Sequence, residues 1–317
     1  MTTHLPLVSV LIPCYNASAW VGQTLDSVLA QTYPRVEVIV VNDGSTDNSR
    51  EVLARFESLG VRVIDQENRG QTAALNEALR HASGEFIQYL DADDLLAPDK
   101  IALQVDRLLH HRDCVASAAW SRFRESTNEA VFRHHETDTD LEPVEWLVRN
   151  WHEGAGMMYP ALWLLPRQLV GAIGPWDERL SLLNDTDYFV RAVLASKSVL
   201  FCGDARTFYR SGIAGSLSGM RSLKGWLSQE VVLFLCQHRL LLREDSERTR
   251  RVISLLWQRF AQSSYPYAPA LANGALIRAS ALSPVQLPPD GGRFYKYVTR
   301  LTGWKLARCL QVISGRP

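Results

Sequence analysis

The sequence predicts an open, mostly parallel α/β sheet flanked by helices, followed by a helical C-terminal region. Three observations lead to this fold class. Apolar, strand-like runs alternate with helical patterns and short loops over the first 90 or so residues. The strand-like runs are apolar on both faces, as buried parallel strands are. A polar loop follows each run, at the sheet edge where ligands bind in such folds.

The first part of the chain contains four expected strands. They cover residues 8–12, 36–41, 61–65 and 85–90, and Pro13 is expected to end the first of them. Branched aliphatic side chains dominate these runs, which favours strands. Helices are expected between the strands, through residues 20–29, 48–58 and 70–82, because their apolar residues recur at helical spacing.

After Pro98 the pattern is mixed. It predicts a helix to about residue 110, strands at 114–123 and 130–132, a loop at 153–159, a helix at 182–195 and an extended segment at 198–209. From about residue 220 only helical patterns follow, at 223–242, 245–263 and 268–282 and from near Phe294. We therefore expect one domain over residues 1–220 and a helical region over residues 221–317.

The bulk composition is that of a globular protein with no dominant charge. Of 317 residues, 46% are hydrophobic, and 34 Lys and Arg balance 34 Asp and Glu, so no global field favours nucleic acid as a partner. The five cysteines are far apart and odd in number, which predicts a reducing cytoplasm rather than a disulfide framework. We expect no signal peptide at residues 1–7, and no apolar run reaches the roughly 18 residues of a membrane span.

An acidic cluster follows the fourth expected strand. Asp91, Asp93 and Asp94 bring three carboxylates into four residues. Carboxylates this close repel one another and raise each other's pKa unless a cation lies among them. Oxygen ligands of this kind suit Mg²⁺ or Mn²⁺, which commonly bridge carboxylates to substrate phosphates. The alternative is a solvated acidic turn, but the position at a strand end, in line with three other polar loops, favours a site.

The sequence lacks the glycine loops that bind nucleotides through backbone amides. No GxGxxG follows the first strand, and no GxxxxGK[ST] occurs. Asp43, at the end of the second strand, can accept a hydrogen bond from a base or ribose. Asp43 and a metal site together could bind a nucleotide diphosphate. The expected reaction is then transfer of the group that the diphosphate carries. Asp185 can then act as a general base, although an Asp at a helix start is more often a cap.

Four linked motifs closely resemble glycosyltransferase family 2. They are residues 8–16 (VSVLIPCYN), residues 37–47 (EVIVVNDGSTD), residues 68–70 (NRG) with Leu75, Asn76 and Ala78, and residues 84–87 (GEFI) leading into the acidic cluster. The resemblance is strong over about residues 5–115 and weaker over about residues 171–209. It implies a GT-A fold and inverting transfer of a sugar from a nucleotide-sugar donor. Residues 1–115 would bind the donor, and residues 116–220 would form the acceptor and catalytic half.

The resemblance also implies roles for individual residues. Pro13, Tyr15 and Asn16 would line the nucleoside pocket, Asp43 would bind the base, and Arg69 and Gly70 would run beside the nucleotide. Asp91, Ala92 and Asp93 match the family's DxD motif. Asp93 is the expected metal ligand, with Asp91 near the ribose or the water shell of a Mn²⁺ or Mg²⁺ ion, while Asp94 mainly orients the turn.

The second half matches the family with two departures. Residues 174–180 (GPWDERL) resemble its Gly-x-Phe-Asp-Glu element, and Asp185 stands where the family has its catalytic base, with Asn184 in place of a Glu and Asp187 as a nearby rival. The pair Tyr209 and Arg210 matches, but Ser211 follows where a His often stands. The Gln-x-x-Arg-Trp motif of processive synthases is absent, which favours addition of a single sugar.

Several features admit two interpretations. His134 and His135, adjacent on one segment, are expected to be surface residues rather than a metal chelate. The four tryptophans from this part of the chain either stack on sugar rings or belong to the core: Trp146, Trp151, Trp163 and Trp176. Residues 291–317 carry six basic residues and no acidic one, with aromatic and aliphatic residues at helical spacing. This segment is either a docked helix or a helix on an anionic membrane surface.

The function most consistent with these features is metal-assisted transfer of one sugar to a glycan or lipid-linked acceptor. The preferred donor is a UDP-sugar, and the expected role is in cell-surface polysaccharide or glycoconjugate synthesis. The protein is expected in the cytoplasm, or peripherally at the inner face of the membrane. Two alternatives are an inactive, nucleotide-binding scaffold, suggested by Asn184 and the missing His, and a nucleotidyltransferase. The second is disfavoured because no glycine- and lysine-rich loop follows the first strand.

Overall fold

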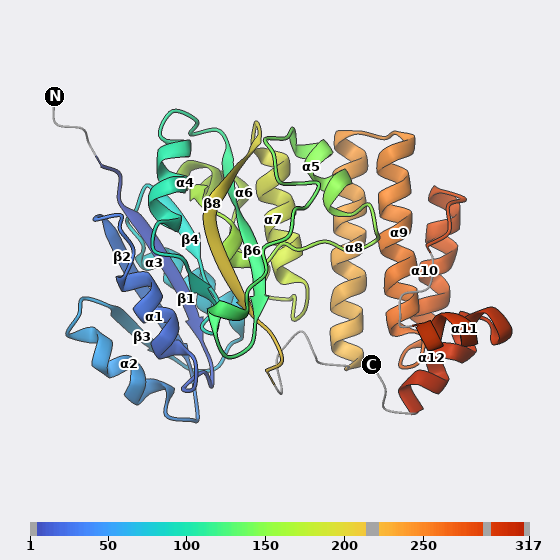
Figure 1. Ribbon diagram of the computed structural model, residues 1–317, viewed down its shortest axis with the longest axis horizontal. Coiled ribbons are helices and arrows are strands. Elements are labelled where there is room, and N and C mark those ends of the chain that lie inside the picture. Colours follow the sequence, from blue (N-terminus) through green and yellow to red (C-terminus); the bar gives the residue numbers. More distant parts are fainter. Residues whose placement is uncertain (1–4, 214–221, 288–292, 314–317) are drawn as a thin grey trace. The chain divides into compact units, whose positions relative to one another are not determined.

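The computed structural model describes residues 5–213, 222–287 and 293–313 (Figure 1). The chain divides into two compact units. One unit comprises Met1–Pro143 with Met158–Gly215, and the other comprises Val144–Met157 with Ser216–Pro317. The boundary expected near residue 220 lies outside the described residues.

The first unit contains a five-stranded sheet in the order β3-β2-β1-β4-β7. Its strands are β1 (Val8–Cys14), β2 (Val36–Asp43), β3 (Arg62–Gln66), β4 (Phe86–Tyr89) and β7 (Leu165–Pro166). The first four are parallel and β7 is antiparallel. The helices α1 (Val21–Leu29), α2 (Ser49–Glu57) and α3 (Gln71–His81) connect them. The predicted fold class is therefore confirmed, with all four expected strands and the three helices between them in place.

A second, three-stranded sheet in the same unit has the order β5-β8-β6. The strand β6 (Val115–Phe123) pairs in parallel with β8 (Val199–Arg210), and the short strand β5 (Leu95–Leu96) is antiparallel to β8. The remaining helices of the unit are α4 (Lys100–Leu108), α6 (Arg167–Ile173) and α7 (Asn184–Ala195), with short 3-10 turns η1 (Thr127–Glu129) and η2 (Pro160–Leu162). Because β5 follows directly after the acidic cluster, this pairing joins the cluster to the end of β8.

Pro13 does not end the first strand, contrary to the prediction. β1 continues to Cys14 and pairs with β2 over its whole length. The carbonyl of Leu11 accepts from Leu90, so odd-numbered residues of β1 turn their backbone polar groups toward β4. Pairing with β4 ends at Leu11. The N–H that Pro13 lacks would therefore point to a side with no partner strand, which removes the usual objection to proline in a central strand.

The strand expected at residues 130–132 is also wrong. The chain there follows the 3-10 turn η1, which Ser126 and Glu129 close as a capping box, and has no regular secondary structure. Val131 is 68% exposed, and Phe132 packs edge-on against Phe208 of β8 at 5.6 Å between ring centroids. Of residues 130–132, only Phe132 makes such a ring contact. The segment therefore has too little apolar surface to stabilise a paired strand.

The second unit is helical. It contains α5 (Pro143–Asn150, of which Pro143 belongs to the first unit), α8 (Leu223–Arg243), α9 (Glu247–Ser264), α10 (Pro269–Leu282), α11 (Arg293–Thr302) and α12 (Trp304–Ile313). α9 packs against both α8 and α10 (Figure 1). Trp257 of α9 is fully buried. The single helix expected from Phe294 is divided at Gly303, whose φ of +78° interrupts the helix between α11 and α12.

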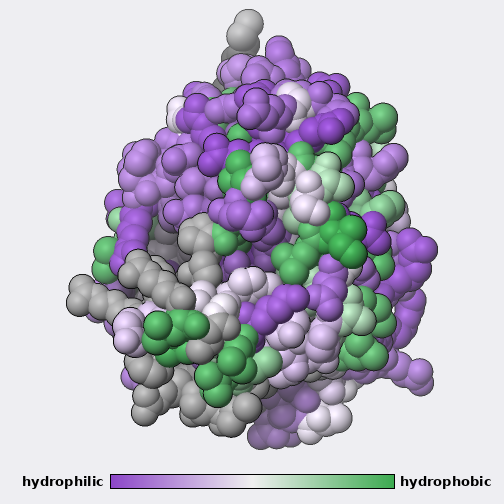
Figure 2. Space-filling view, turned by 90° about the vertical axis from the view of Figure 1, so that its right-hand side faces the viewer, coloured by the Kyte–Doolittle hydropathy of each residue, from purple (hydrophilic) through white to green (hydrophobic). Residues whose placement is uncertain are grey.

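Several large apolar side chains of the helical unit face solvent. Figure 2 shows separate hydrophobic patches on the hydrophilic surface of one face of the molecule. The exposed apolar residues of this unit include Leu223, Leu227, Val231, Phe234, Ile277, Tyr297, Leu301, Leu306 and Leu310. Among the described residues, no helix combines the length and the apolar character needed to cross a bilayer.

Candidate active site

Asp43, at the C-terminal end of β2, organises the loop after β3. Its Oδ1 accepts from Gln66 Nε2 at 2.7 Å and from the Arg69 amide at 2.8 Å, and its Oδ2 accepts from the Gly70 amide at 2.8 Å. The carboxylate is only 2% exposed. Gly70 has φ +92°, a backbone conformation that is unfavourable for any residue with a Cβ atom. Glycine at this position therefore lets the amide reach Asp43.

Asn16, after β1, holds the neighbouring loop. Its Oδ1 accepts from the amides of Thr46 and Asp47, and its own amide donates to Ser45 Oγ at 3.0 Å. Its φ of +50° is one that Asn tolerates better than most residues. Beside it, Tyr15 is 52% exposed, so its ring is available at the same sheet edge as Asp43. Pro13 is buried beneath this edge.

The acidic cluster lies in the turn between β4 and β5, and its charges are poorly compensated. Burial, with the charges of Asp93 and Asp185, raises the pKa of Asp91 to about 8, although Gln71 Nε2 donates to its Oδ1 at 2.8 Å. Burial also raises the pKa of Asp93. Asp94 is fully buried, and its pKa lies well above the usual range because of burial and the charges of Asp93 and Asp91.

Arg210, the last residue of β8, fixes this turn. Its amide donates to Asp94 Oδ1 at 2.8 Å and its Nε to the carbonyl of Asp93 at 2.8 Å. Its Nη2 donates to Gln23 Oε1, and its guanidinium lies over the ring of Trp20 at 4.6 Å. The sequence indicated this residue only as half of a Tyr-Arg pair. Its clamping role depends on partners from three other segments, which no local pattern reveals.

Asp185 lies at the start of α7, and hydrogen bonds from its neighbour Asn184 to Gln71 and from Gln71 to Asp91 connect it to the acidic cluster. Asn184 Nδ2 donates to Gln71 Oε1 at 3.1 Å. Burial raises the pKa of Asp185 to about 6, against the opposing effect of the Thr186 amide, which donates to it at 2.7 Å. Leu183, immediately before the helix, has φ +55°, which is unusual for a bulky side chain and frequent next to functional residues.

Asp187, the rival candidate for a base, is engaged elsewhere. It is 1% exposed and forms an ion pair with Arg191 at 3.2 Å. The adjacent Tyr188 stacks in parallel on Trp176, with ring centroids 4.0 Å apart. Asn76 holds Trp176 in turn, by accepting from its amide and donating to its carbonyl. These contacts anchor the first turn of α7 and favour Asp185 over Asp187 as the reactive carboxylate.

The four tryptophans considered as sugar platforms belong to the core, so that interpretation is wrong. All of them are 1–3% exposed: Trp146, Trp151, Trp163 and Trp176. Their burial follows from size, because a tryptophan is the largest apolar side chain available to fill a core. The side chains of the adjacent His134 and His135 contact different partners and do not form a metal chelate with each other. His134 is near Asp138 at 3.5 Å, whereas His135 stacks on Trp120.

The donor set of the acidic cluster fits a hard divalent cation. It consists of carboxylate oxygens whose mutual repulsion a cation would remove, and Asp94 Oδ2 is buried without a hydrogen-bond partner. Within the described ranges, no three His, Cys, Asp or Glu side chains are arranged to hold a metal by themselves. Further ligands would therefore come from substrate phosphates and water, as is common for Mg²⁺.

Comparison with known proteins decides the family. Residues 9–170, just over half of the chain, match the family model described as glycosyl transferase family 2. The chain belongs to glycosyltransferase family 2. The resemblance of its strand-end motifs is thereby confirmed.

Two curated relatives and one solved structure illustrate what the family 2 chain is similar to. It is 31% identical over 206 residues to an uncharacterized glycosyltransferase of Rickettsia typhi, covering 63% of this chain and 62% of that protein. It is 40% identical over 120 residues to the putative teichuronic acid biosynthesis glycosyltransferase TuaG of Bacillus subtilis, covering 37% and 47%. The chain thus spans less than two thirds of the length of these relatives.

The solved structure confirms the GT-A fold. The crystal structure of residues 1–349 of S. aureus TarS in complex with UDP-GlcNAc superposes with a TM-score of 0.67 at 18% identity, covering 98% of this chain and 92% of that one. At this identity the similarity is one of fold. It extends over both the sheet unit and the helical unit of the family 2 chain.

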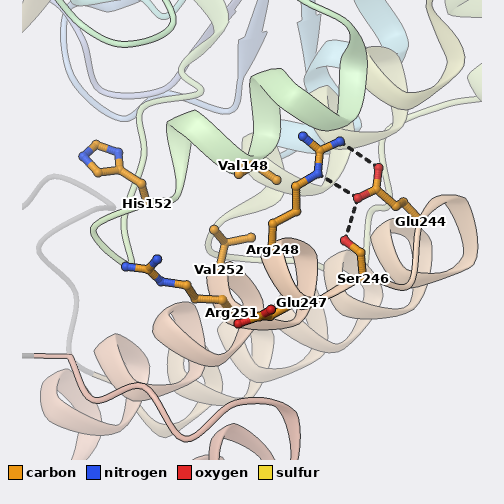
Figure 3. A pocket seen from close by; sticks show the side chains of 8 residues that line it. All are labelled: Val148, His152, Glu244, Ser246, Glu247, Arg248, Arg251 and Val252. Carbon is orange, nitrogen blue, oxygen red and sulfur yellow. Dashed lines mark hydrogen bonds and ion pairs between the residues drawn. The ribbon is translucent and has the colours of Figure 1, made fainter.

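A pocket of about 530 Å³ lies within the helical unit (Figure 3). Arg248 pairs there with Glu244 at 2.8 Å and with Glu145 of α5, and Ser246 donates to Glu244 at 2.6 Å. Hydrogen bonds from Arg248 and Ser246 lower the pKa of Glu244 to about 2. Since these charged groups satisfy one another and none is a predicted site residue, we interpret the network as the contact that joins α5 to α9.

Proposed function

We propose that this chain is an inverting glycosyltransferase. It transfers a single sugar from a nucleotide diphosphate sugar, with a UDP-sugar as the expected donor, to a glycan or lipid-linked acceptor. One observation carries the proposal: Gln71 donates to Asp91 and accepts from Asn184, so hydrogen bonds connect the acidic cluster to the start of α7, where Asp185 stands. A diphosphate site and a carboxylate base within one cluster are what a direct displacement requires.

The sheet edge formed by β1, β2 and the loop after β3 suits the nucleoside. We assign Pro13, Tyr15 and Asn16 to this pocket, with the exposed Tyr15 ring available to the base. Asp43 already accepts three hydrogen bonds, so its Oδ2 has room for one more donor, such as an imide N–H of the base. Arg69, Gly70 and Ala92 would border the nucleotide, and residues 1–115 would form the donor half of the domain.

Asp93 and Asp91 would hold the divalent cation, Mn²⁺ or Mg²⁺, together with the donor's phosphates. When bound, the cation offsets the charge that builds up on the departing diphosphate. The buried, unpartnered Asp94 Oδ2 and the raised pKa values of Asp91 and Asp93 support a cation at this position.

Asp185 would act as the general base. Its carboxylate accepts the proton of an acceptor hydroxyl while that oxygen bonds to the anomeric carbon of the donor sugar. The bond between this carbon and the diphosphate oxygen breaks on the opposite side, which inverts the configuration. A pKa of about 6 suits the role, because the carboxylate is ionised at neutral pH yet more basic than an exposed Asp.

The proposed role is in cell-surface polysaccharide or glycoconjugate synthesis, on the cytoplasmic side of the membrane. Similarity to a relative named for teichuronic acid biosynthesis and to a structure holding UDP-GlcNAc supports the pathway class and the donor. Residues 116–220 would supply the acceptor half. The absence of a Gln-x-x-Arg-Trp motif supports addition of one sugar at a time.

The C-terminal helices offer a contact with an anionic membrane surface. Tyr297 and Leu301 of α11 are 62% and 69% exposed, and Leu306 and Leu310 of α12 are also exposed. Residues 291–317 carry six basic residues and no acidic one. Removal of residues 291–317 should abolish flotation with vesicles containing anionic lipid. Unchanged flotation, compared with vesicles of neutral lipid, would remove the membrane contact.

A donor screen tests the function as a whole. Purified protein is incubated with UDP-, GDP- and dTDP-sugars, with and without Mn²⁺, and release of the nucleoside diphosphate is measured. We expect metal-dependent hydrolysis of one UDP-sugar in the absence of acceptor, and its loss in Asp185→Asn. Metal-dependent binding of the diphosphate without turnover of any donor would instead identify an inactive nucleotide-binding protein.

A further inference from the structure

One face of the three-stranded sheet presents aromatic side chains next to an exposed arginine, Arg122. In the parallel register, Trp120 lies opposite Thr207 and Arg122 opposite Tyr209. Residues two apart on a strand share a face, so these four side chains stand on the same side of the sheet. Trp120 and Tyr209 are partly exposed, and Arg122 is exposed.

Tyr159 connects this face to the acidic cluster. Its buried ring contacts Tyr209 edge-on at 5.2 Å and Trp120 at 6.2 Å, and its hydroxyl bonds to Thr207 Oγ1. Thr207 pairs across the sheet with Leu96, two residues after Asp94, so Tyr159 lies near the acidic cluster. The charges of Asp94 and Asp91 accordingly add to burial in raising the pKa of Tyr159 well above its usual range. The aromatic face therefore begins beside the proposed reaction centre.

Arg122 is an exposed arginine of this face whose guanidinium lies near an aromatic ring. Its guanidinium lies over the Tyr209 ring at 5.8 Å, and it makes no ion pair with any residue that the structure describes. By contrast, the exposed Arg107 pairs with Asp140 and the exposed Arg69 with Glu178. On the opposite face of the sheet, Arg206 lies over Phe132 and Arg210 clamps the acidic turn.

The chemistry of these groups matches an anionic sugar. Aromatic rings offer large, rigid apolar surfaces with which the C–H face of a sugar ring can pack. A guanidinium presents a planar fork of donors that fits a phosphate or carboxylate. His135 stacks nearly parallel on Trp120, with ring centroids 5.3 Å apart, so it adds a polar aromatic ring beside the indole.

We propose that Trp120, Tyr209 and Arg122 form an acceptor subsite for a glycan that carries an anionic group, a phosphate or a carboxylate, next to its accepting sugar. This inference rests on the proposed function, because it concerns the acceptor of that reaction. The two aromatic rings hold a sugar ring of the acceptor, and Arg122 binds the anionic group. The subsite thereby selects charged over neutral acceptor chains.

The test measures binding of three oligomers of similar length by calorimetry, in the presence of UDP and Mn²⁺. The oligomers are a glycerol phosphate chain, an alternating glucuronic acid and N-acetylglucosamine chain, and a neutral N-acetylglucosamine chain. We expect wild-type protein to bind at least one anionic oligomer more tightly than the neutral one. Arg122→Gln should weaken this binding about tenfold, the usual effect of losing a charge-assisted pair. Arg122→Lys should be intermediate.

Arg206→Gln is the matched control, because Arg206 is an exposed arginine on the other face of the same sheet that has no ion pair among the described residues. It should leave all three affinities unchanged. Equal losses in Arg122→Gln and Arg206→Gln, or no preference of the wild type for an anionic oligomer, would overturn the subsite. UDP binding in the presence of Mn²⁺ is measured in a separate titration before any oligomer is added. Its absence in wild-type protein would refute the proposed function itself, while intact UDP binding without oligomer preference would refute the subsite alone.

Discussion

Gln71 and Asn184 hydrogen-bond through their side-chain amides at 3.1 Å, although 113 residues separate them in the chain. The amide nitrogen of Gln71 donates at the same time to Asp91 Oδ1. The two amides thus tie the acidic cluster to the start of α7, where Asp185 lies. An ionised Glu at position 184 could not donate to Gln71, so Asn184 and Gln71 form a matched pair.

Replacement of Gln71 should separate positioning from donor binding. In Gln71→Ala, α7 loses its tether to Asp91, and we expect kcat to fall about tenfold, since small displacements of a base cost at least this much. The Kd for UDP should change little. Gln168→Ala, which removes a surface glutamine whose amide donates to the carbonyl of Arg112, serves as the control. A weakened Kd with unchanged kcat would place Gln71 in donor binding instead.

A negative charge at position 184 should shift the pH profile. Asn184→Glu puts a carboxylate next to Asp185 and Asp91, which disfavours the ionised form of Asp185 and raises its pKa above about 6. The acidic limb of kcat/KM should therefore move to higher pH. The measurement is kcat/KM between about pH 5 and 9. Asn184→Gln keeps the amide and should leave the limb in place, and an unshifted limb in the Glu variant would contradict the electrostatic contact.

Asp185 should govern the rate without governing donor affinity. The base must be ionised, so activity of the wild type should fall as pH drops through about 6, tenfold per unit below it. Asp185→Asn should lower transfer by about a thousandfold, in the range for loss of a general base, with UDP binding intact. Asp93→Ala should weaken both transfer and metal-dependent UDP binding. Full activity in Asp185→Asn would eliminate it as the base.

Asp187 should be a stability residue. It is buried and pairs with the partly buried Arg191, so Asp187→Ala removes this ion pair, a change that costs up to about 3–5 kcal/mol of unfolding free energy. Thermal and denaturant unfolding measure the effect. Asp177→Ala, which breaks the exposed pair with Arg179, should destabilise much less. A stable but inactive Asp187→Ala protein would revive Asp187 as the base.

The sheet could be predicted from the sequence because its information is local. Apolar runs such as residues 36–41 and the turns after them identify parallel strands without reference to the rest of the chain. Helices α5 and α6 were not predicted. Pro143 at the first position of α5 was a usable signal, since proline favours helix starts. The extent of β1 past Pro13 depended on where pairing with β4 stops, which a single strand does not reveal.

The candidate site divides in the same way. Asp43 and the acidic cluster follow strands and were identified as a group, and Asp185 was identified through resemblance. Gln71 was not, because its importance arises from a contact with Asn184 on a distant segment. Arg210 was seen only as part of a pair, since its hydrogen bonds reach Gln23 and the acidic turn. Residues whose role is to connect segments carry no signal in their own neighbourhood.

Residues 144–157 belong to the helical unit, although the chain before and after them belongs to the sheet unit. The polypeptide therefore passes between the units three times, at residues 143–144, 157–158 and 215–216. A gene that lost everything after residue 215 would still encode α5, with Glu145 deprived of Arg248 and the carbonyl of Glu153 deprived of Arg259. A break of the chain after residue 215 therefore divides the helical unit and leaves residues 144–157 without the rest of it.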